Sequence, residues 1–381
     1  MNAISTTATL LNSTAAGSSV HIGRLNELAL RGLDRMFDRD NQLFCHHMRM
    51  TGGKLLRQGL SRRYTLISLL GLQKAEEAGY KSPIPIADVT AKLLHEYRRI
   101  TNLGDLGLLI WLAGRVIPDQ LMMRTFDMDL LGALDHYPDA REACTMELAW
   151  FLTALSECAL AHLPVVGGQE QLAVKTWKLL RNNCGKHGYF VQSARGKGLA
   201  GVVRGRIGSF AEQVYPIYAL SRCAQAYGSE EALQTATACA QAICDAQGPL
   251  GQWWWHYDAT QGSVIGRYPV YSVHQHGMAP MALFAISEAG TRDFTPYIYR
   301  GLQWITGDNE LQFDMRSESD HMIWRSIYRH RRKRIVSEAL NLTILNGHGG
   351  KPSGLDVKWD CCPYELGWLL FALAGVNDAH A

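Results

Sequence analysis

The stretch that decides the fold is Leu106-Gly107-Leu108-Leu109-Ile110-Trp111-Leu112-Ala113. It is apolar on every side of a helix, so a helix formed here must be buried all round. Other stretches of the same character recur along the chain, and several end at Gly, which closes a helix in the left-handed conformation with little strain. The buried helices predicted in this way span residues 61–79, 103–115, 144–161, 210–228, 271–290 and 360–375.

More amphipathic stretches alternate with the buried ones, near residues 23–36, 86–100, 119–134, 169–180, 230–246 and 295–305. Their charges gather on one side of a helical period, which is typical of an outer layer that faces solvent. Repeated units that cannot bury an apolar face alone favour a stacked or closed repeat architecture. We therefore predict an all-α (α/α)6 toroid of about six inner and outer helix pairs, with short aromatic loops or hairpins at one end.

An open α-solenoid with the same number of helices is the alternative architecture. The spacing between successive buried helices grows from about forty to more than about sixty residues along the chain, whereas solenoid repeats are short and uniform. This uneven spacing favours the closed ring.

Composition bounds the number of domains. The chain has 381 residues, of which 47% are hydrophobic and 19% charged, and no Pro/Ser-rich linker divides it. These values favour one large core. We expect a disordered N-terminal tail over residues 1–20, which has no basic region typical of a signal peptide, and a single toroid domain over residues 21–381.

The net charge limits which partners the protein can bind, and the cysteine residues indicate its cellular compartment. The net charge of +3 is too small for a general nucleic-acid binder, although Arg329 and the run Arg331-Arg332-Lys333-Arg334 are locally basic. No segment is long and apolar enough to span a membrane. Most of the nine Cys fall in apolar helices, where a reduced thiol acts as a small hydrophobic group. We expect a cytoplasmic protein without nucleic-acid partners, and the sequence leaves its oligomeric state open.

In a ring of helix pairs, the loops that enter the inner helices gather at one mouth of the central cavity. The richest of these loops contains three consecutive Trp and continues to Pro280. Aromatic faces stack on sugar rings while polar groups bond the hydroxyls, although at least one Trp is expected to be a buried plug. Candidate binding residues here are Trp253, Trp254, Trp255, His256, Tyr257, Arg267 and Tyr268, and candidate catalytic residues are Asp258, Tyr271, His274 and His276.

Two further loops enter buried helices and carry polar candidates. Arg204 and Arg206 follow the Gly-flanked cations of residues 194–198 and suit an anionic group, or are ordinary surface charges. Glu212 and Tyr215 then begin a buried helix, where Glu212 can equally serve as a helix cap. The last loop supplies Trp359, Asp360, Tyr364 and Glu365, with Asp360 equally suited to an N-cap.

The loop Trp255-His256-Tyr257-Asp258, leading into helices of a ring of helix pairs, resembles those of α/α-toroid enzymes that act on carbohydrates. This group includes sugar epimerases, uronyl hydrolases, uronate lyases and glucuronyl C5-epimerases. The resemblance covers most of the chain as architecture, but no motif matches residue by residue. It implies an enzyme whose partner is a sugar or polysaccharide substrate that can be anionic.

Two reactions are compatible with that resemblance. A lyase or epimerase would abstract a proton with Tyr215, Tyr271, His274 or His276, while Arg204, Arg206 or Arg267 neutralises the substrate carboxylate. A glycoside hydrolase would instead use two carboxyl groups, for which Glu212, Asp258, Asp360 and Glu365 are candidates.

Readings of other classes remain open. Terpene cyclases and prenyltransferases share the toroid, and Gln252-Trp253 and Gln303-Trp304 resemble the Gln/Trp repeats of cyclases, but Asp127-Met128-Asp129 matches their acid motif only in part. A noncatalytic glycan-binding protein would use the same aromatic residues. The pairs His46-His47 and His274/His276 lack the further ligands that zinc requires, so we expect no metal and no other cofactor.

Overall fold

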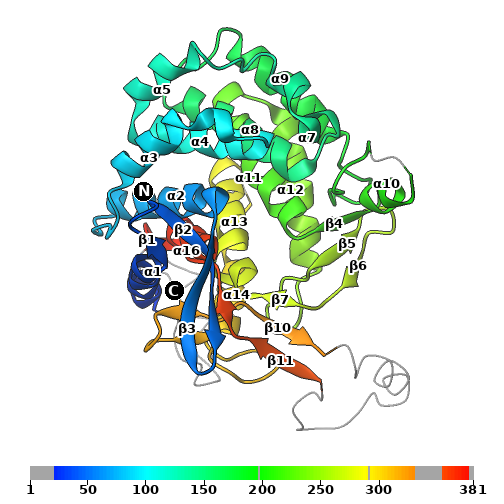
Figure 1. Cartoon of the computed structure of the whole chain (residues 1–381). Coiled ribbons are helices and arrows are strands. Elements are labelled where there is room, and N and C mark those ends of the chain that lie inside the picture. The colour runs from blue at the N-terminus through cyan, green and yellow to red at the C-terminus, as the bar shows by residue number, and fades with distance from the viewer. Residues whose placement is uncertain (1–20, 196–197, 291, 331–353, 377–381) are drawn as a thin grey trace, which may run out of the picture.

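The structure, a computed structural model, describes residues 21–195, 198–290, 292–330 and 354–376, so the N-terminal tail, Lys197 and the run Arg331–Arg334 lie outside it. Six inner helices follow one another around a ring, and the last of them packs against the first (Figure 1). These inner helices are α2 (Arg62–Glu77), α4 (Leu103–Val116), α8 (Thr145–Leu160), α11 (Ala211–Tyr227), α13 (Ala279–Ala289) and α16 (Pro363–Leu373).

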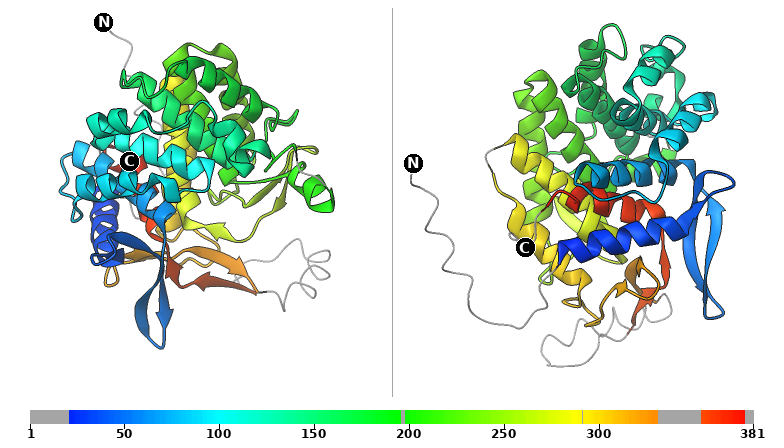
Figure 2. Two further views of the ribbon diagram at one scale, coloured as in Figure 1. Left: turned by 45° about the horizontal axis from the view of Figure 1, so that its top comes forward. Right: turned by 90° about the vertical axis from the view of Figure 1, so that its left-hand side faces the viewer.

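An outer layer of helices covers the ring. Its members are α1 (Ile22–Met36), α3 (Ile86–His95), α5 (Pro118–Thr125), α9 (Gln169–Arg181), α12 (Glu230–Asp245) and α14 (Thr295–Ile305). The views of Figure 2 place α1, at the start of the chain, beside α16 at its end. The fold is therefore the predicted α/α toroid.

The inner helices form where the sequence is apolar and capped. In α4, Leu108, Leu109 and Ile110 are fully buried, and the side chain of Asn102 caps the helix by accepting the N–H of Asp105 at 3.0 Å. The stretch 271–290 differs from the prediction, because a short π-helix, η2 (His274–Met278), precedes α13. Pro280 in the first turn of α13 has no N–H to donate to this preceding turn.

Glycines allow the ring to close tightly. A Cβ on Gly71 of α2 would lie 2.0 Å from the carbonyl oxygen of Gly367 of α16, and a Cβ on Gly367 would lie 2.7 Å from the Cα of Ser68. No larger side chain fits between these two backbones without moving them. The first and last inner helices thus meet backbone to backbone.

The predicted outer helix at 119–134 is shorter than expected. After α5 the chain leaves the helical conformation and re-forms only a single turn, α6 (Ala133–His136). Met128 and Leu130 are buried in this break, and the Asp129 side chain accepts the N–H of Gly132 at 2.9 Å. Packing and this local bond therefore compete successfully with helix propagation. Other short helices are η1 (Tyr97–Arg99), α7 (Pro138–Arg141) and α10 (Gly198–Arg204).

Small antiparallel sheets lie at one end of the ring, where the inner helices begin (Figure 1). One joins β1 (Phe37–Asp38), β2 (Leu43–Thr51), β3 (Lys54–Leu60) and β12 (Asp360–Cys361). The others join β7 (Val270–Tyr271), β10 (Ser326–Arg329) and β11 (Leu355–Lys358); β4 (Ile207–Ser209), β5 (His256–Asp258) and β6 (Ser263–Gly266); and β8 (Arg316–Ser317) with β9 (Met322–Ile323). In the described residues no helix is long and apolar enough to cross a bilayer.

Candidate active site

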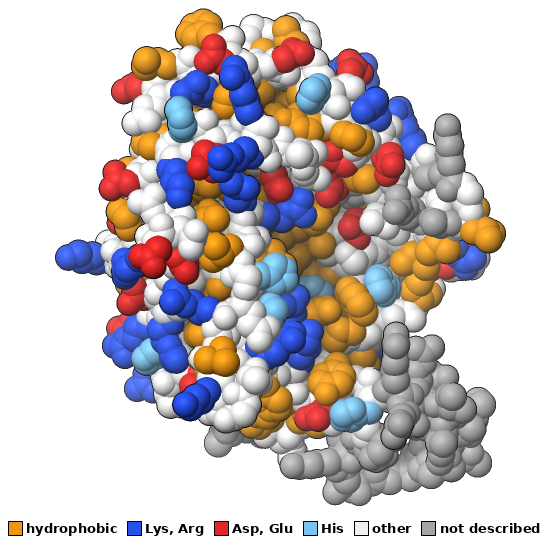
Figure 3. Space-filling model, viewed as in Figure 1, with side chains coloured by type: hydrophobic (Ala, Val, Ile, Leu, Met, Phe, Trp, Pro, Cys, Tyr) orange, Lys and Arg blue, Asp and Glu red, His pale blue; other side chains and the backbone are white. Residues whose placement is uncertain are grey.

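A cavity of about 260 Å³ opens where the inner helices begin, and we call it the central cavity. In the view of Figure 3, basic, histidine and apolar side chains surround a hollow near the middle of the face. Residues from different inner helices and from the strands meet at the central cavity because the ring brings the helix N-termini together. Its lining is Arg63, Tyr64, Ile67, Met146, Trp150, Ser209, Ala211, Tyr215, Trp255, Tyr271, His274, Met278, Arg325 and Tyr364.

Aromatic rings form most of the wall of the central cavity. Tyr64 of α2 lies against Tyr364 of α16, with ring centroids 4.6 Å apart. Trp255 meets Tyr271 edge to face at 5.7 Å. Flat apolar faces with polar edges are the surfaces on which sugar rings pack in proteins.

Two guanidinium groups line the central cavity. Arg63, in the first turn of α2, pairs with Asp105 at 2.5 Å and lies over the ring of Trp150 at 5.2 Å. Arg325, which precedes β10, lies over the ring of Tyr271 at 5.6 Å. Both guanidinium groups are less than a third exposed, so their charges are weakly screened. The central cavity is therefore suited to an anionic ligand.

Acidic residues recur at the third position of the inner helices: Asp105 in α4, Glu147 in α8 and Glu365 in α16, with Glu212 one position earlier in α11. Glu365 accepts the N–H of Cys362, and Glu212 accepts both the N–H and the hydroxyl of Ser209. These two carboxyl groups therefore cap their own helices. Acidic side chains are also favoured at helix N-termini by the helix dipole.

Glu147 differs from the other three acids. Its carboxyl group accepts no hydrogen bond from another residue in the described part of the chain, although it lies between Met146 and Trp150, which line the central cavity. Burial raises its pKa, an effect opposed by Arg63 and reinforced by Asp139 and Glu212. A carboxyl group that is uncommitted and holds its proton to higher pH suits a general acid.

The phenols and imidazoles at the central cavity are poor bases. Burial raises the pKa of Tyr64 to about 12, and burial also raises the pKa of Tyr271. Burial lowers the pKa of His274 to about 3, so this imidazole stays neutral over the physiological range. Tyr64 and Tyr271 therefore stay protonated near neutral pH, and His274 is too weak a base to hold a proton there.

The structure brings together at the central cavity five of the residues singled out from the sequence. They are Tyr215, Trp255, Tyr271, His274 and Tyr364. Trp255 stacks on His256, with ring centroids 4.3 Å apart, so His256 supports the wall from behind. These five residues come from three different loops and line one cavity.

Other aromatic candidates lie outside the lining. Trp253 and Tyr257 are fully buried and both pack near the ring of Phe210, as core residues. His276 is fully buried, and burial lowers its pKa to about 3. Extended backbone turns Trp254 away from Trp255, and its ring packs under the guanidinium of Arg267 at 5.5 Å.

The remaining candidates have partners elsewhere. Asp258 pairs with Arg206 at 2.6 Å, which lowers the pKa of Asp258, and closes the turn between β5 and β6. Asp360 pairs with Lys358 and Arg49 at 3.4 and 3.5 Å. Further from the cavity lining, Trp359 packs on Trp324, the hydroxyl of Tyr268 donates to Glu310, and Arg204 falls in the last turn of α10.

The features that favoured a terpene cyclase have structural roles. Asp127 lines a separate pocket beside α3 and α5, away from the central cavity. Gln252 and Trp304 both donate to Glu310, at 3.2 and 2.9 Å, so these two residues join α14 and the turn after it to the segment that follows α12. Among the described residues, no three His, Cys, Asp or Glu side chains converge as a metal site.

Sequence reasoning missed Arg63, Asp105, Glu147 and Arg325. The first three could have been found from the sequence, because each stands in the first turn of a predicted inner helix, where site residues were sought. The spacing of those three charges is the signal that could have found them. Arg325 had no such signal, since it follows the irregular segment between α14 and β10.

The fold is an α/α toroid, and the central cavity lies at the N-terminal mouth of its inner ring. No family model and no curated protein matches the chain. Among solved structures, an unsaturated glucuronyl hydrolase specific for heparin is 16% identical, with a TM-score of 0.57 over 92% of this chain and 95% of that chain.

Two further structures show the same fold. The unsaturated glucuronyl hydrolase of Bacillus sp. GL1, responsible for the degradation of glycosaminoglycan, is 14% identical, with a TM-score of 0.58 over 93% of this chain and 96% of its own. A possible member of the GH105 family from Salmonella enterica subsp. enterica serovar Paratyphi A is 11% identical, with a TM-score of 0.61 over 96% and 97%. At these identities the likeness establishes the architecture alone.

Proposed function

We propose that this chain is a glycoside hydrolase that releases an acidic, uronyl sugar from the end of a glycan. The observation that carries the proposal is the buried carboxyl group of Glu147, which interacts electrostatically with Arg63 of the cavity lining and is flanked in α8 by the lining residues Met146 and Trp150. The similar solved structures bear the names of unsaturated glucuronyl hydrolases, which favours hydrolysis over proton abstraction. The raised pKa of Tyr271 and the lowered pKa of His274 favour the same choice.

The size of the central cavity bears on the mode of attack. Its volume of about 260 Å³ is near the lower end of ligand pockets, which run from about 300 to 1,000 Å³. The hydrogen-bonded pair Tyr215 and Trp368 lies at its base, between the mouth and the opposite end of the ring. A terminal sugar unit fits so small a space with a floor better than the middle of a long chain does.

In the proposed reaction, Glu147 donates its proton to the glycosidic oxygen as the bond to the anomeric carbon breaks. Water adds its oxygen to that carbon and passes a proton to a second carboxylate. We assign this role to Asp105, which Arg63 holds at 2.5 Å and which lines the neighbouring pocket on the other side of Arg63. One acid and one base on either side of a bond is the arrangement that glycoside hydrolysis requires. Trp255 and Tyr64 would pack on the sugar faces.

Incubation with unsaturated and saturated uronyl disaccharides tests the proposal. Hydrolysis of an unsaturated uronide removes the ultraviolet absorbance of its double bond and releases a new reducing end. A gain of absorbance on polysaccharides would instead reveal a lyase, and solvent deuterium in an uncleaved sugar would reveal an epimerase. Saturable binding with no chemical change across the panel would reveal a glycan-binding protein and overturn the proposal.

A further inference from the structure

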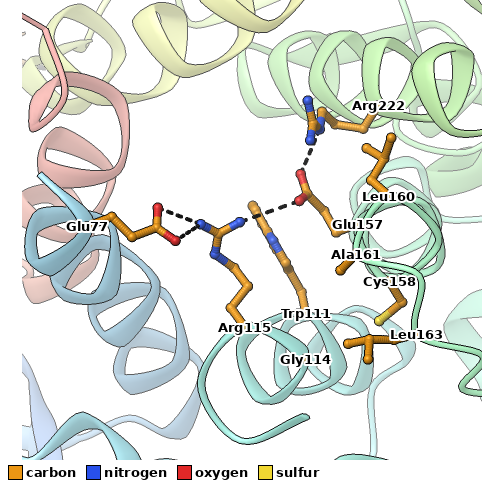
Figure 4. Close-up of a pocket in the computed structure, with 10 residues that line it drawn as sticks. All are labelled: Glu77, Trp111, Gly114, Arg115, Glu157, Cys158, Leu160, Ala161, Leu163 and Arg222. Carbon is orange, nitrogen blue, oxygen red and sulfur yellow. Dashed lines mark hydrogen bonds and ion pairs between the residues drawn. The ribbon is translucent and has the colours of Figure 1, made fainter.

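Two buried Glu–Arg pairs at opposite ends of the inner ring differ in how firmly they are held. At the end away from the central cavity, Glu157 accepts a hydrogen bond of 2.8 Å from Arg222 (Figure 4). It accepts another of 2.8 Å from the hydroxyl of Tyr218. Arg115 lies 3.6 Å from the same carboxyl group and also binds Glu77. This network joins four inner helices, and its charged groups satisfy one another.

The pair beside the central cavity, Arg325 and Glu365, is looser. Nε of Arg325 and Oε1 of Glu365 are 3.6 Å apart, and both atoms are buried without a hydrogen-bond partner in the residues that the structure describes. The other oxygen of Glu365 accepts the N–H of Cys362, and Nη1 of Arg325 donates to the Cys362 sulfur at 2.6 Å. Buried charged groups normally satisfy their hydrogen bonds, so this guanidinium retains capacity for an oxygen ligand.

Building on the proposed function, we propose that Arg325 receives the carboxylate of the acidic sugar and that Glu365 is the counter-ion it exchanges for that carboxylate, with uptake of one proton by Glu365. Arg325 lines the central cavity, and Tyr271 below it fixes the plane of the guanidinium. A planar fork of N–H donors matches a carboxylate. Two carboxylates close to one buried cation repel, so the one that is already enclosed by protein becomes neutral.

The groups around Glu365 make its protonation accessible. They are Arg325; Asp360, with Arg49 and Lys358 beyond it; the thiols of Cys45, Cys361 and Cys362; and the phenols of Tyr64, Tyr271 and Tyr364. Burial raises the pKa of Glu365 to about 7, while Arg325 opposes the rise and Asp360 adds to it. A second carboxylate on Arg325 would raise this pKa further.

Calorimetric titration with glucuronic acid in buffers of different ionisation enthalpy measures the protons taken up on binding. Near pH 8, the unaltered protein is expected to take up close to one proton per sugar bound. Glu365→Gln should bind the sugar without proton uptake, and Arg325→Gln should bind it about 100-fold more weakly. Glu157→Gln, which alters the matched pair at the other end of the ring, should keep both the affinity and the uptake.

The outcomes separate this inference from the proposed function. Binding and hydrolysis of a uronide without proton uptake, or equal uptake by Glu365→Gln, would overturn the exchange and leave the hydrolase standing. Neither binding nor hydrolysis of any uronide would overturn both. Should Glu365→Gln not fold, the pH dependence of the unaltered protein decides, because its affinity must fall about tenfold per pH unit above the pKa of Glu365, and a flat profile contradicts the exchange.

Discussion

The indole N–H of Trp368 donates a hydrogen bond of 3.0 Å to the hydroxyl of Tyr215, which joins α16 to α11 beneath the central cavity. Trp111 packs on Trp368 from the opposite side, with ring centroids 6.2 Å apart. This aromatic layer separates the central cavity from the ionic network around Glu157. The hydroxyl of Tyr215 accepts this bond and burial raises its pKa, so this side chain stays protonated near neutral pH.

Replacing Glu147 by Gln should abolish most of the turnover. Loss of a general acid typically lowers kcat by about 10²- to 10⁴-fold, while substrate binding changes little. Steady-state kinetics on a uronyl disaccharide, with a thermal melt to verify folding, measure the effect. Unchanged kcat in this variant, combined with loss of turnover in His274→Ala and Tyr271→Phe, would mean that hydrolysis by carboxyl groups is wrong.

Replacing Glu212 by Gln provides the matched comparison, because this acid stands at the start of a neighbouring inner helix. Its carboxylate accepts the N–H and hydroxyl of Ser209, so we expect a loss of about 1 kcal/mol in stability through the weakened cap. The kcat should remain within a few-fold of the unaltered value. A kcat as low as that of Glu147→Gln would place Glu212 in the chemistry.

The pH profile of kcat should have an alkaline limb set by Glu147. Burial raises the pKa of this group above its ordinary value, and a general acid acts only while protonated. Turnover at saturating substrate should therefore be full below that raised pKa and fall about tenfold per unit above it. A stopped assay over a series of buffers tests this, and a kcat that rises as pH increases through the same range would contradict the assignment.

Trp255 and Trp253 should respond oppositely to replacement by Ala. Trp255 lines the central cavity, so its loss should raise KM about tenfold, the scale of one aromatic packing contact, with little change in stability. Trp253 is fully buried, and its loss should cost about 3–5 kcal/mol of unfolding free energy. Kinetics and denaturant titrations separate the two effects. Equal responses in both would show that Trp255 does not contact the sugar.

Gly71→Ala should destabilise the toroid, because the added methyl group would meet the backbone of Gly367. Overpacking of this kind costs about 1–3 kcal/mol or more. Gly167→Ala is the control, since a Cβ there meets no atom within 4 Å. Urea titrations of both variants check the prediction. Equal midpoints would mean that α2 and α16 can separate without cost.

The fold could be predicted from the sequence because each inner helix carries its own signal. Apolar stretches such as 144–161 match α8 almost end to end, since a helix buried on every side leaves no ambiguity of face. Closure of the ring was also predictable from the number and spacing of the helices. The contact between Gly71 and Gly367 was not, because two glycines almost 300 residues apart give no local sign of their meeting.

The position of the candidate site could be predicted from the sequence, but the identity of the residues that line it could be predicted only in part. Neighbouring residues on extended backbone point to opposite sides, so Trp255 lies at the cavity while Trp254 does not, and sequence alone gives no phase for this alternation. Arg206 and Asp258 were assigned to different roles, yet they bind each other across the sheet that joins β4 to β5. Long-range pairing of this kind depends on strand register.

An acidic residue recurs at the third position of α4, α8 and α16, so the same position accepts a carboxyl group in several inner helices. All three stand in the first turn of their helices, at the end of the ring where the central cavity opens, so a proton donor can be moved from one inner helix to another by point substitution while the backbone stays as it is. A new specificity on this ring can therefore arise by a change in which helix carries the acidic side chain, with the loops unchanged.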